Sequence, residues 1–561
     1  MSLRTLYQAL LDSEPAHLRV IARQWDITLA GERRIDLAAE LTDAMARAEA
    51  AERAWDALPS DSRAALEDLL RRDGAMPWPA FTRRWGQVRN IGPGRLEREE
   101  VWRDPISPTE DLWYRGFVHR TSTVGPTGVA LEMAFVPEDL RLYLPTPPPL
   151  EIPAPEPASA PLQIRPGEDT LADDLVTLWS MLQNEVVRPT EEGIWPTRRR
   201  EALLSRLHAP AVPRLALLEA LAYEQSWISV DEREHLRPVP EPMLAWLRAD
   251  RWTQWLALAR AWQKSQHWND LAAVPTLQSD AVLGWPNDPL VTRENFLELL
   301  ALCTPGIWYA IDAFVTHAEE HMPDFLRPNG DYETWSLRDT LTSTPLRGFE
   351  AWEMVEGALL TFLVVGPLSW LGLVDLGQSN PHLPPDRFRL SEAGAAFLDL
   401  KEPPQLADPS PLKVHPGGLL IVPSARRYER FQLSRVATVT GSGIPHHFRL
   451  TPRSLARARR QRISLERIEE FLEEAAGEPL PSGLRKGLEH TYRAGERVKL
   501  ARGWILRVQD PDLLTYEAVR DLIQEQLGSR VALIRESDRE RLLEVLTSEG
   551  ILPEIEEGVG P

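Results

Sequence analysis

The stretch TPRSLARARRQRISLERIEEFLEEAAGEPLPSGLRKGLEHTYRAGERVKLARGWILRV, Thr451–Val508, decides the fold predicted for its region. Its start and stop signals predict a helix capped by Thr451, a helix from Ser464 to Gly477, a helix from Ser482 to about Arg493, and a hairpin over residues 498–508. Three short helices followed by a hairpin is the order of a winged helix. In that fold the third helix can lie in the major groove of DNA, and the hairpin can touch its backbone or minor groove.

The first of these helices separates a basic face from an apolar face. Arg453, Arg457 and Arg460 fall together on a helical projection, whereas Leu455 and Ala458 lie roughly opposite. One face can therefore pack while the other meets anions.

Charge is concentrated in the same region. Residues 411–508 hold 19 Lys and Arg against nine Asp and Glu, a local net charge of +10 in a chain whose total is −20. A polyanion would be attracted here and repelled by most of the remaining surface. We predict seven DNA-contacting residues: Arg453, Arg457, Arg460, Arg485, Lys486, Arg493 and Arg502. The alternative is a solvated face whose arginines pair with the glutamates of the neighbouring helix, Glu466 to Glu474.

Four runs in this part of the chain carry a family resemblance: LKVHPGGLLIVP, FRLTPRSLARA, SLERIEEFLEEAAGEPLPSGLRKGLEH and WILRVQDPDLL. They resemble the helicase-associated domain of bacterial proteins related to the N-terminal region of XPB-type DNA repair helicases, over roughly Pro411 to Pro553. Two upstream runs, PDFLRPNGDYETWSLRD (Pro323–Asp339) and GFEAWEMVEGALLTFLVVGPLSWLGLVDL (Gly348–Leu376), are also similar to those proteins. The resemblance implies a DNA-related role, but it does not indicate a particular activity.

Length and composition predict a multidomain cytoplasmic protein. A chain of 561 residues is too long for one core. The most apolar run, Ala358–Val374, is interrupted by Gly366-Pro367 and Ser369, so we expect no membrane span. The N-terminus lacks the pattern of a signal peptide. The single cysteine, Cys303, rules out an internal disulfide and a multi-cysteine zinc site.

The predicted fold class is α+β, mainly α, with tandem winged-helix-like modules and a small C-terminal α/β helicase-associated domain. The predicted segments are a small helical unit (1–50), a winged-helix-like domain (51–144), a Pro-rich linker (145–168), a helical domain (169–285), a second winged-helix-like domain (286–405), the XPB-related domain with the basic winged helix (406–553) and an acidic tail (554–561). The linker carries nine prolines within residues 145–166, a composition that favours an extended, semi-rigid spacer.

A weak internal repeat supports this architecture. Leu112–Val118 and Leu368–Val374 share the pattern L-x-[YW]-x-G-[FL]-V, and Leu546–Leu552 is a looser third copy. The pattern predicts a helix that ends at a left-handed glycine and is followed by a strand.

Other elements are predicted near the C-terminus and in the middle of the chain. A helix should carry Val519 to Leu527 on one face, a strand over Arg530–Arg535 could pair with Leu419–Val422, and a capping box over Ser537–Glu540 should start the last helix. Five tryptophans lie between residues 243 and 271. Trp255 and Trp262 share one helical face with Leu258 and Ala259, which favours burial over base stacking.

No catalytic motor is expected. The sequence contains no GxxxxGK[ST] phosphate loop, and Asp231–His235 is a charged turn rather than a metal-holding acidic motif. His317 and His321 fit H-x-x-E-H, but no third ligand is identifiable, so a metallohydrolase is only a weak alternative. Cys303 is predicted to be a core thiol.

Taken together, these features predict a non-catalytic DNA-binding protein of the helicase-associated type, without cofactors. It would bind duplex or forked DNA and act in DNA repair or transcription-linked transactions with a separately encoded helicase or nuclease. The alternative is a protein-interaction scaffold whose winged helices bind such a partner.

Overall fold

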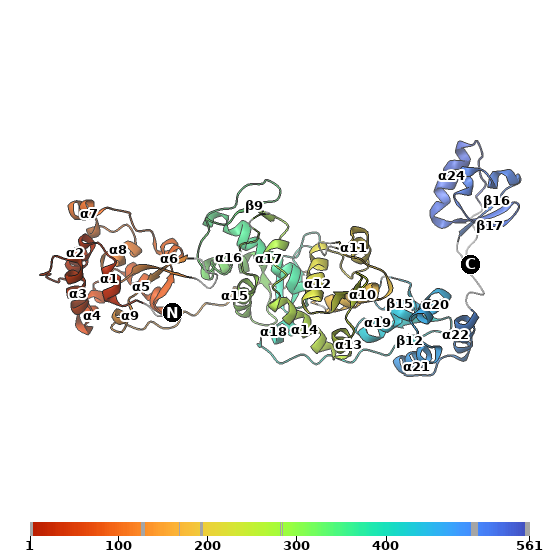
Figure 1. The fold of residues 1–561 in the computed structure, drawn as a ribbon, viewed down its shortest axis with the longest axis horizontal. Helices are drawn as coiled ribbons and strands as arrows, with labels where there is room; N and C mark the ends of the chain where they lie inside the picture. The colour runs from red at the N-terminus through yellow and green to blue at the C-terminus, as the bar shows by residue number, and fades with distance from the viewer. Residues whose placement is uncertain are drawn as a thin grey trace. The chain divides into compact units, whose positions relative to one another are not determined.

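The computed structural model describes residues 4–124, 130–167, 169–190, 195–280, 282, 284–441, 443–494 and 503–555. Helices account for 48% and strands for 13%, which confirms the predicted α+β, mainly α class. The chain folds into two compact units (Figure 1). Unit 1 is Met1–Pro411, Val422–Arg435 and Gly441–His446, and unit 2 is Leu412–Ile421, Val436–Thr440 and His447–Pro561.

The N-terminal part of unit 1 joins helices to a three-stranded sheet. Its elements are α1 (Leu6–Leu11), α2 (Pro15–Gln24), α3 (Arg34–Met45), α4 (Ala48–Asp56), α5 (Ser60–Arg71), β1 (Ala75–Pro77), α6 (Trp78–Trp85), α7 (Pro93–Glu99), η1 (Val101–Arg103), α8 (Pro108–Tyr114), β2 (His119–Val124), β3 (Ala130–Phe135) and α9 (Glu138–Arg141). The antiparallel sheet has the order β1-β3-β2. One buried core extends from Leu6 to Leu144, so the first four helices pack against the mixed part that follows them.

Part of the Pro-rich segment is paired with a sheet within unit 1. β4 (Gln163–Arg165) pairs antiparallel with β10 (Val374–Gln378), and the Ala158 amide donates to the Trp308 carbonyl at 2.7 Å. The Arg387 guanidinium also donates to the Ser159 carbonyl. Proline has no amide to give to a ladder, but the proline-free run 162–165 can join a sheet edge. This end of the segment is therefore an edge strand and not the free spacer that its composition predicted.

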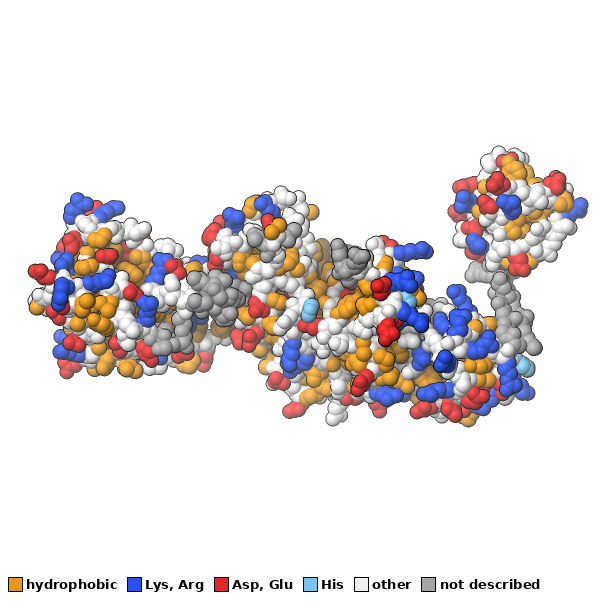
Figure 2. Space-filling model, in the orientation of Figure 1, with side chains coloured by type: hydrophobic (Ala, Val, Ile, Leu, Met, Phe, Trp, Pro, Cys, Tyr) orange, Lys and Arg blue, Asp and Glu red, His pale blue; other side chains and the backbone are white. Residues whose placement is uncertain are grey.

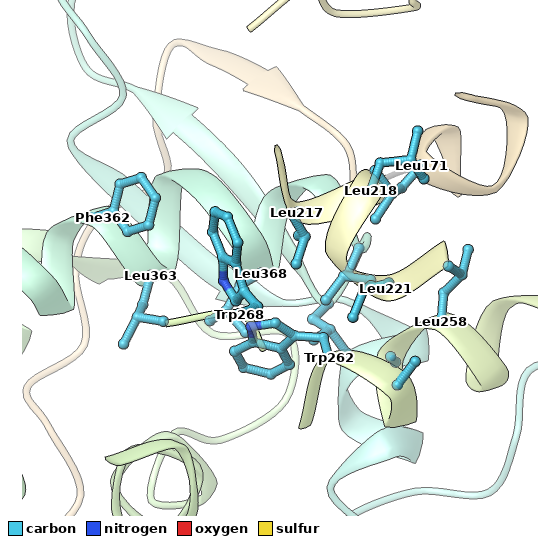
Figure 3. Close-up of a cluster of buried hydrophobic side chains, with 14 of the residues drawn as sticks. Leu171, Leu217, Leu218, Leu221, Leu258, Trp262, Trp268, Phe362, Leu363 and Leu368 are labelled. Carbon is cyan, nitrogen blue, oxygen red and sulfur yellow. The ribbon is translucent and has the colours of Figure 1, made fainter. Parts of the chain in front are cut away.

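The middle of unit 1 is helical. Its elements are α10 (Thr170–Asn184), α11 (Thr197–Leu204), α12 (Val212–Glu224), β5 (Ile228–Val230), β6 (Leu236–Pro238), α13 (Pro240–Arg248), α14 (Arg251–Lys264), η2 (Leu271–Ala273) and β7 (Leu277–Ser279). Trp262 and Trp268 lie in the buried cluster with leucines of α10, α12 and α14 (Figure 3). Both indole N–H groups donate to one carboxylate oxygen of Asp270, at 3.0 and 2.7 Å. The prediction that these rings are buried is confirmed.

A second mixed region completes unit 1. Its elements are α15 (Pro289–Ala301), β8 (Tyr309–Ala310), α16 (Ile311–His321), β9 (Leu337–Asp339), η3 (Phe349–Ala351), η4 (Glu353–Gly357), α17 (Ala358–Leu363), η5 (Val364–Leu368), β10, β11 (Arg387–Leu390), α18 (Glu392–Phe397) and α19 (Arg427–Val436). The main sheet has the order β4-β10-β11-β8. The helical run Phe349–Leu368 is long and apolar enough to cross a membrane, but 72% of its most apolar window is buried, as in a core helix.

The three copies of the predicted repeat share one helix-ending motif. Gly116, Gly372 and Gly550 all have φ between 68° and 78°. In each copy the glycine amide donates to the carbonyl three residues back, and the next amide donates to the carbonyl five residues back, which is the Schellman arrangement. A strand follows soon after in the first two copies, at β2 and β10, whereas no strand follows Gly550 among the described residues. The repeat therefore marks a helix end in all three copies and a strand start in two.

Unit 2 contains two small sheets, five α-helices and two short 3-10 helices among its described residues. Its elements are β12 (Lys413–Val414), β13 (Leu419–Val422), β14 (Thr438–Val439), β15 (His446–Arg449), α20 (Pro452–Arg460), α21 (Leu465–Ala476), α22 (Ser482–Ala494), β16 (Gly503–Arg507), η6 (Pro511–Leu514), α23 (Glu517–Arg520), β17 (Ile523–Gly528), β18 (Val531–Arg535), η7 (Glu536–Asp538) and α24 (Arg539–Ser548). The sheets have the orders β12-β13-β15-β14 and β16-β18-β17.

Three predictions about the C-terminal part were wrong. β18 pairs with β16 and β17 instead of Leu419–Val422, because strand pairing over long sequence separations cannot be read from local pattern. The helix predicted through Leu527 ends at Arg520, and Ile523–Gly528 is a strand, since a short apolar run fits both periods. The last helix has Asp538 at its N-cap and no capping box.

The predicted wing is only partly described. Its second arm, β16, pairs with β18, and its first arm and tip, residues 498–502, lie outside the described residues.

Candidate nucleic-acid interface

The basic face is built on α20, whose start is fixed by local signals. The Thr451 hydroxyl accepts from the Ser454 amide at 3.1 Å, and the Ser454 hydroxyl accepts from the Thr451 amide at 3.0 Å. Pro452 occupies the first helical position, where its missing N–H costs nothing. Leu455 and Ala458 are buried, which orients the opposite face toward solvent as predicted.

The three predicted arginines of α20 are not equivalent. Arg453 and Arg460 are exposed, and neither has a hydrogen-bond or ion-pair partner among the described residues. Arg457 is partly buried and donates to the Ala437 carbonyl at 2.6 Å. Burial lowers the pKa of Arg457, and the charges of Arg453 and Arg460 lower it further. The face therefore holds three like charges that act on one another.

The third helix contributes fewer free cations than predicted. Leu484 and Leu488 bury one side of α22, and Lys486 and Arg493 are exposed. Arg485 instead turns toward α21, where it pairs with Glu473 and lies 3.7 Å from Glu469. The ion-pair alternative therefore describes Arg485 but not Arg453 or Arg460. Arg502 lies outside the described residues.

Charges are segregated between neighbouring helices. Lys and Arg side chains gather over α20 and α22, and acidic side chains gather along α21 (Figure 2). The exposed carboxylates of α21 are Glu466, Glu470 and Glu474. Because these three carboxylates would repel a polyanion, the α20 and α22 side of this helical group offers it the more favourable approach.

Sequence reasoning missed further exposed arginines beside this face. Arg459 donates to the Tyr492 carbonyl at 3.3 Å, while the side chains of Arg462 and Arg467 have no hydrogen-bond or ion-pair partner among the described residues. The run ARARRQR shows this density of arginines in the sequence. The helical projection, however, selected as DNA-contacting only the arginines that share one face of the helix. Arg462 and Arg467 lie outside α20, on the turn and the following helix.

The other candidate site residues are part of the core or lack further ligands. His317 is buried on α16, and its ring centroid lies 4.5 Å from that of His321. Across the described parts of the chain, no group of three or more His, Cys, Asp and Glu residues could hold a metal ion. Cys303 is buried, and burial raises its thiol pKa to about 12, as expected of a core thiol.

Comparison with known families gives one match in this part of the chain. Residues 414–532 match a family described as helicase conserved C-terminal domain. This supports a helicase-associated protein with a helicase-related nucleic-acid function. Comparison with curated proteins gave no match. The matched segment includes α19, whose Phe431 belongs to the core of unit 1, and the three helices α20, α21 and α22.

Proposed function

We propose that this protein is a non-catalytic DNA-binding protein of the helicase-associated, XPB N-terminal-like type. It would bind duplex or forked DNA through the α20 and α22 face of unit 2. The DNA strands would be moved or cut by a separately encoded helicase or nuclease, in repair or transcription-linked transactions. The protein is expected to act in the cytoplasm, as the composition predicts.

The observation that carries the proposal is the pair of exposed cations on one face of α20. The side chains of Arg453 and Arg460 are exposed and have no hydrogen-bond or ion-pair partner among the described residues. The charge of each also lowers the pKa of Arg457, which lies on the same face. Three like charges on one face repel one another, and a phosphate backbone would relieve that repulsion while releasing counterions. Lys486 and Arg493 would add contacts from α22, whereas Arg485 would stay paired with Glu473.

The test is a salt series with a basic-face double variant, Arg453→Ala with Arg460→Ala. Removing one arginine from a phosphate should lower the slope of log affinity against log salt by about 0.9, so we expect the slope to flatten by about 1.8 and binding at 0.1 M salt to weaken roughly 60-fold. Folding should be retained because both side chains are exposed. Arg457 is left intact because its bond to Ala437 also supports the fold.

The matched control replaces two exposed arginines of unit 1, Arg188 and Arg347, by alanine. This control removes the same charge and should leave the slope unchanged. If both double variants weaken binding equally, binding follows net charge and not this face. If the unmodified protein shows no salt-dependent DNA binding, the scaffold alternative becomes the better interpretation.

One observation favours that scaffold alternative. A groove of about 720 Å³ runs beside β16, lined by Trp504, Leu506, Leu542 and Leu546. Among the described residues β16 is an edge strand of its sheet, so an extended segment of a partner could add to this edge while its apolar side chains fill the groove.

A further inference from the structure

Arg462 occupies a backbone conformation that its side chain does not favour. Its φ is +60°, in the left-handed region, at the turn between α20 and α21. The Arg462 amide donates to the Arg459 carbonyl, and the Ile463 amide donates to the Ala458 carbonyl, both at 3.0 Å. This is the Schellman helix end, whose left-handed position is usually glycine because a Cβ atom is strained there.

The same pair of hydrogen bonds ends six other helices among the described residues. The residue in the left-handed position is glycine at three of these ends and a short polar residue at the other three: Gly116, Gly372, Gly550, Asp26, Ser226 and Asp399. Glycine removes the strain, and a short polar side chain can offset it by hydrogen-bonding to the nearby backbone. Arginine does neither, so helix termination does not explain Arg462.

Contacts within unit 2 do not explain it either. The Arg462 side chain is exposed and has no hydrogen-bond or ion-pair partner among the described residues. A cation near a helix C-terminus is favoured by the helix dipole, but Arg457, Arg459 and Arg460 already lie in the last turn of α20. Strain that the fold does not offset is a reason to seek a contact outside the protein.

We propose that Arg462 is a further phosphate-contacting residue and that the α20–α21 turn holds it in a strained conformation for that purpose. The inference rests on the proposed DNA-binding function and names the sugar-phosphate backbone as the group recognised. Arg460 precedes the turn and Arg467 lies in the first turn of α21, next to the exposed Glu466, so exposed cations flank Arg462 on both sides in the sequence. Contacts of arginines with phosphates position a protein on DNA and carry no base readout.

The test is the substitution Arg462→Gly, which separates fold from function because the two should change in opposite directions. Glycine relieves the left-handed strain, so hydrogen exchange in peptides spanning α20 and α21 should slow by about two- to fivefold. On a labelled duplex of arbitrary sequence, the slope of log affinity against log salt should fall by about 0.9, roughly an eightfold loss at 0.1 M salt. Arg462→Lys keeps the cation and should retain the slope.

Asp399→Gly is the matched control, because Asp399 ends α18 with the same hydrogen bonds in unit 1. It should leave DNA binding unchanged. The inference is overturned if Arg462→Gly binds with the unmodified slope, or if exchange in α20 and α21 becomes faster. If the unmodified protein shows no salt-dependent binding, it is the proposed function that fails.

Discussion

Replacing Asp173 by asparagine is expected to lower the free energy of unfolding of unit 1 by about 3–5 kcal/mol. The Asp173 carboxylate accepts from Arg427 and from Arg430, each at 3.0 Å, and both guanidinium groups are buried. Arg427 would keep its ion pair with Asp169 at 2.7 Å. Arg430 would lose its ion-pair partner in a setting where burial already lowers its pKa.

Chemical denaturation should measure this loss. Asparagine keeps the size and shape of the side chain, removes its charge and replaces one carboxylate oxygen by an NH2 donor. Asp36→Asn, which breaks an exposed ion pair with Arg33, should change stability by less than about 1 kcal/mol. A second variant, Asp173→Asn with Arg430→Met, should recover much of the loss because it removes the unpaired charge as well. A loss below about 1 kcal/mol for Asp173→Asn would show that α19 is not held by these ion pairs.

Acidification is expected to destabilise the N-terminal part of unit 1 through two buried histidines. Burial lowers the pKa of His17 to about 4 and that of His119 to about 3, each from an ordinary value near 6.5. Below pH 6.5 these two histidines therefore bind protons in the unfolded chain but not in the folded chain, and the free energy of unfolding falls as the pH drops from about 6.5 to 4. The lowered pKa of His17 alone corresponds to about 3 kcal/mol over that interval.

Denaturation followed by tryptophan fluorescence at pH 7 and pH 4.5 can detect this effect, because the His17 ring stacks on Trp113 with centroids 5.2 Å apart. Glutamine at position 17 keeps an N–H donor for the Trp113 carbonyl and cannot titrate, so the stability lost on acidification should be clearly smaller. His382→Gln on an exposed loop is the control. Equal losses in His17→Gln and the unmodified protein would contradict the assignment.

Local signals allowed much of the fold to be predicted. The start of α20 needs only Thr451 and Pro452, and the end of α21 needs only Gly477, which has φ +70°. The helix ends predicted by the repeat were also found in all three copies, because the Schellman motif is specified within seven residues. Predictions failed where a distant partner decides the structure. β16 pairs with β18, which lies more than twenty residues further along the chain.

In the candidate site, too, features set by local sequence were predicted, and contacts with other elements were missed. Helical projection placed Arg453 and Arg460 on an exposed face, and the structure agrees. It could not show that Arg457 would reach the Ala437 carbonyl or that Arg485 would pair with Glu473, because both partners come from other elements. The strained conformation of Arg462 gives no sequence signal, since the usual marker of that position is glycine.

The most direct test of the proposed interface is hydrogen exchange of the full-length protein with and without duplex DNA at low salt. Binding at the basic face should slow exchange in peptides covering 452–467 and 482–494, while peptides covering the later turns of α21, residues 468–476, and the peptides of unit 1 should exchange as before. Protection confined to unit 1, or no DNA-dependent protection anywhere in residues 412–494, would contradict the proposed DNA interface on α20 and α22.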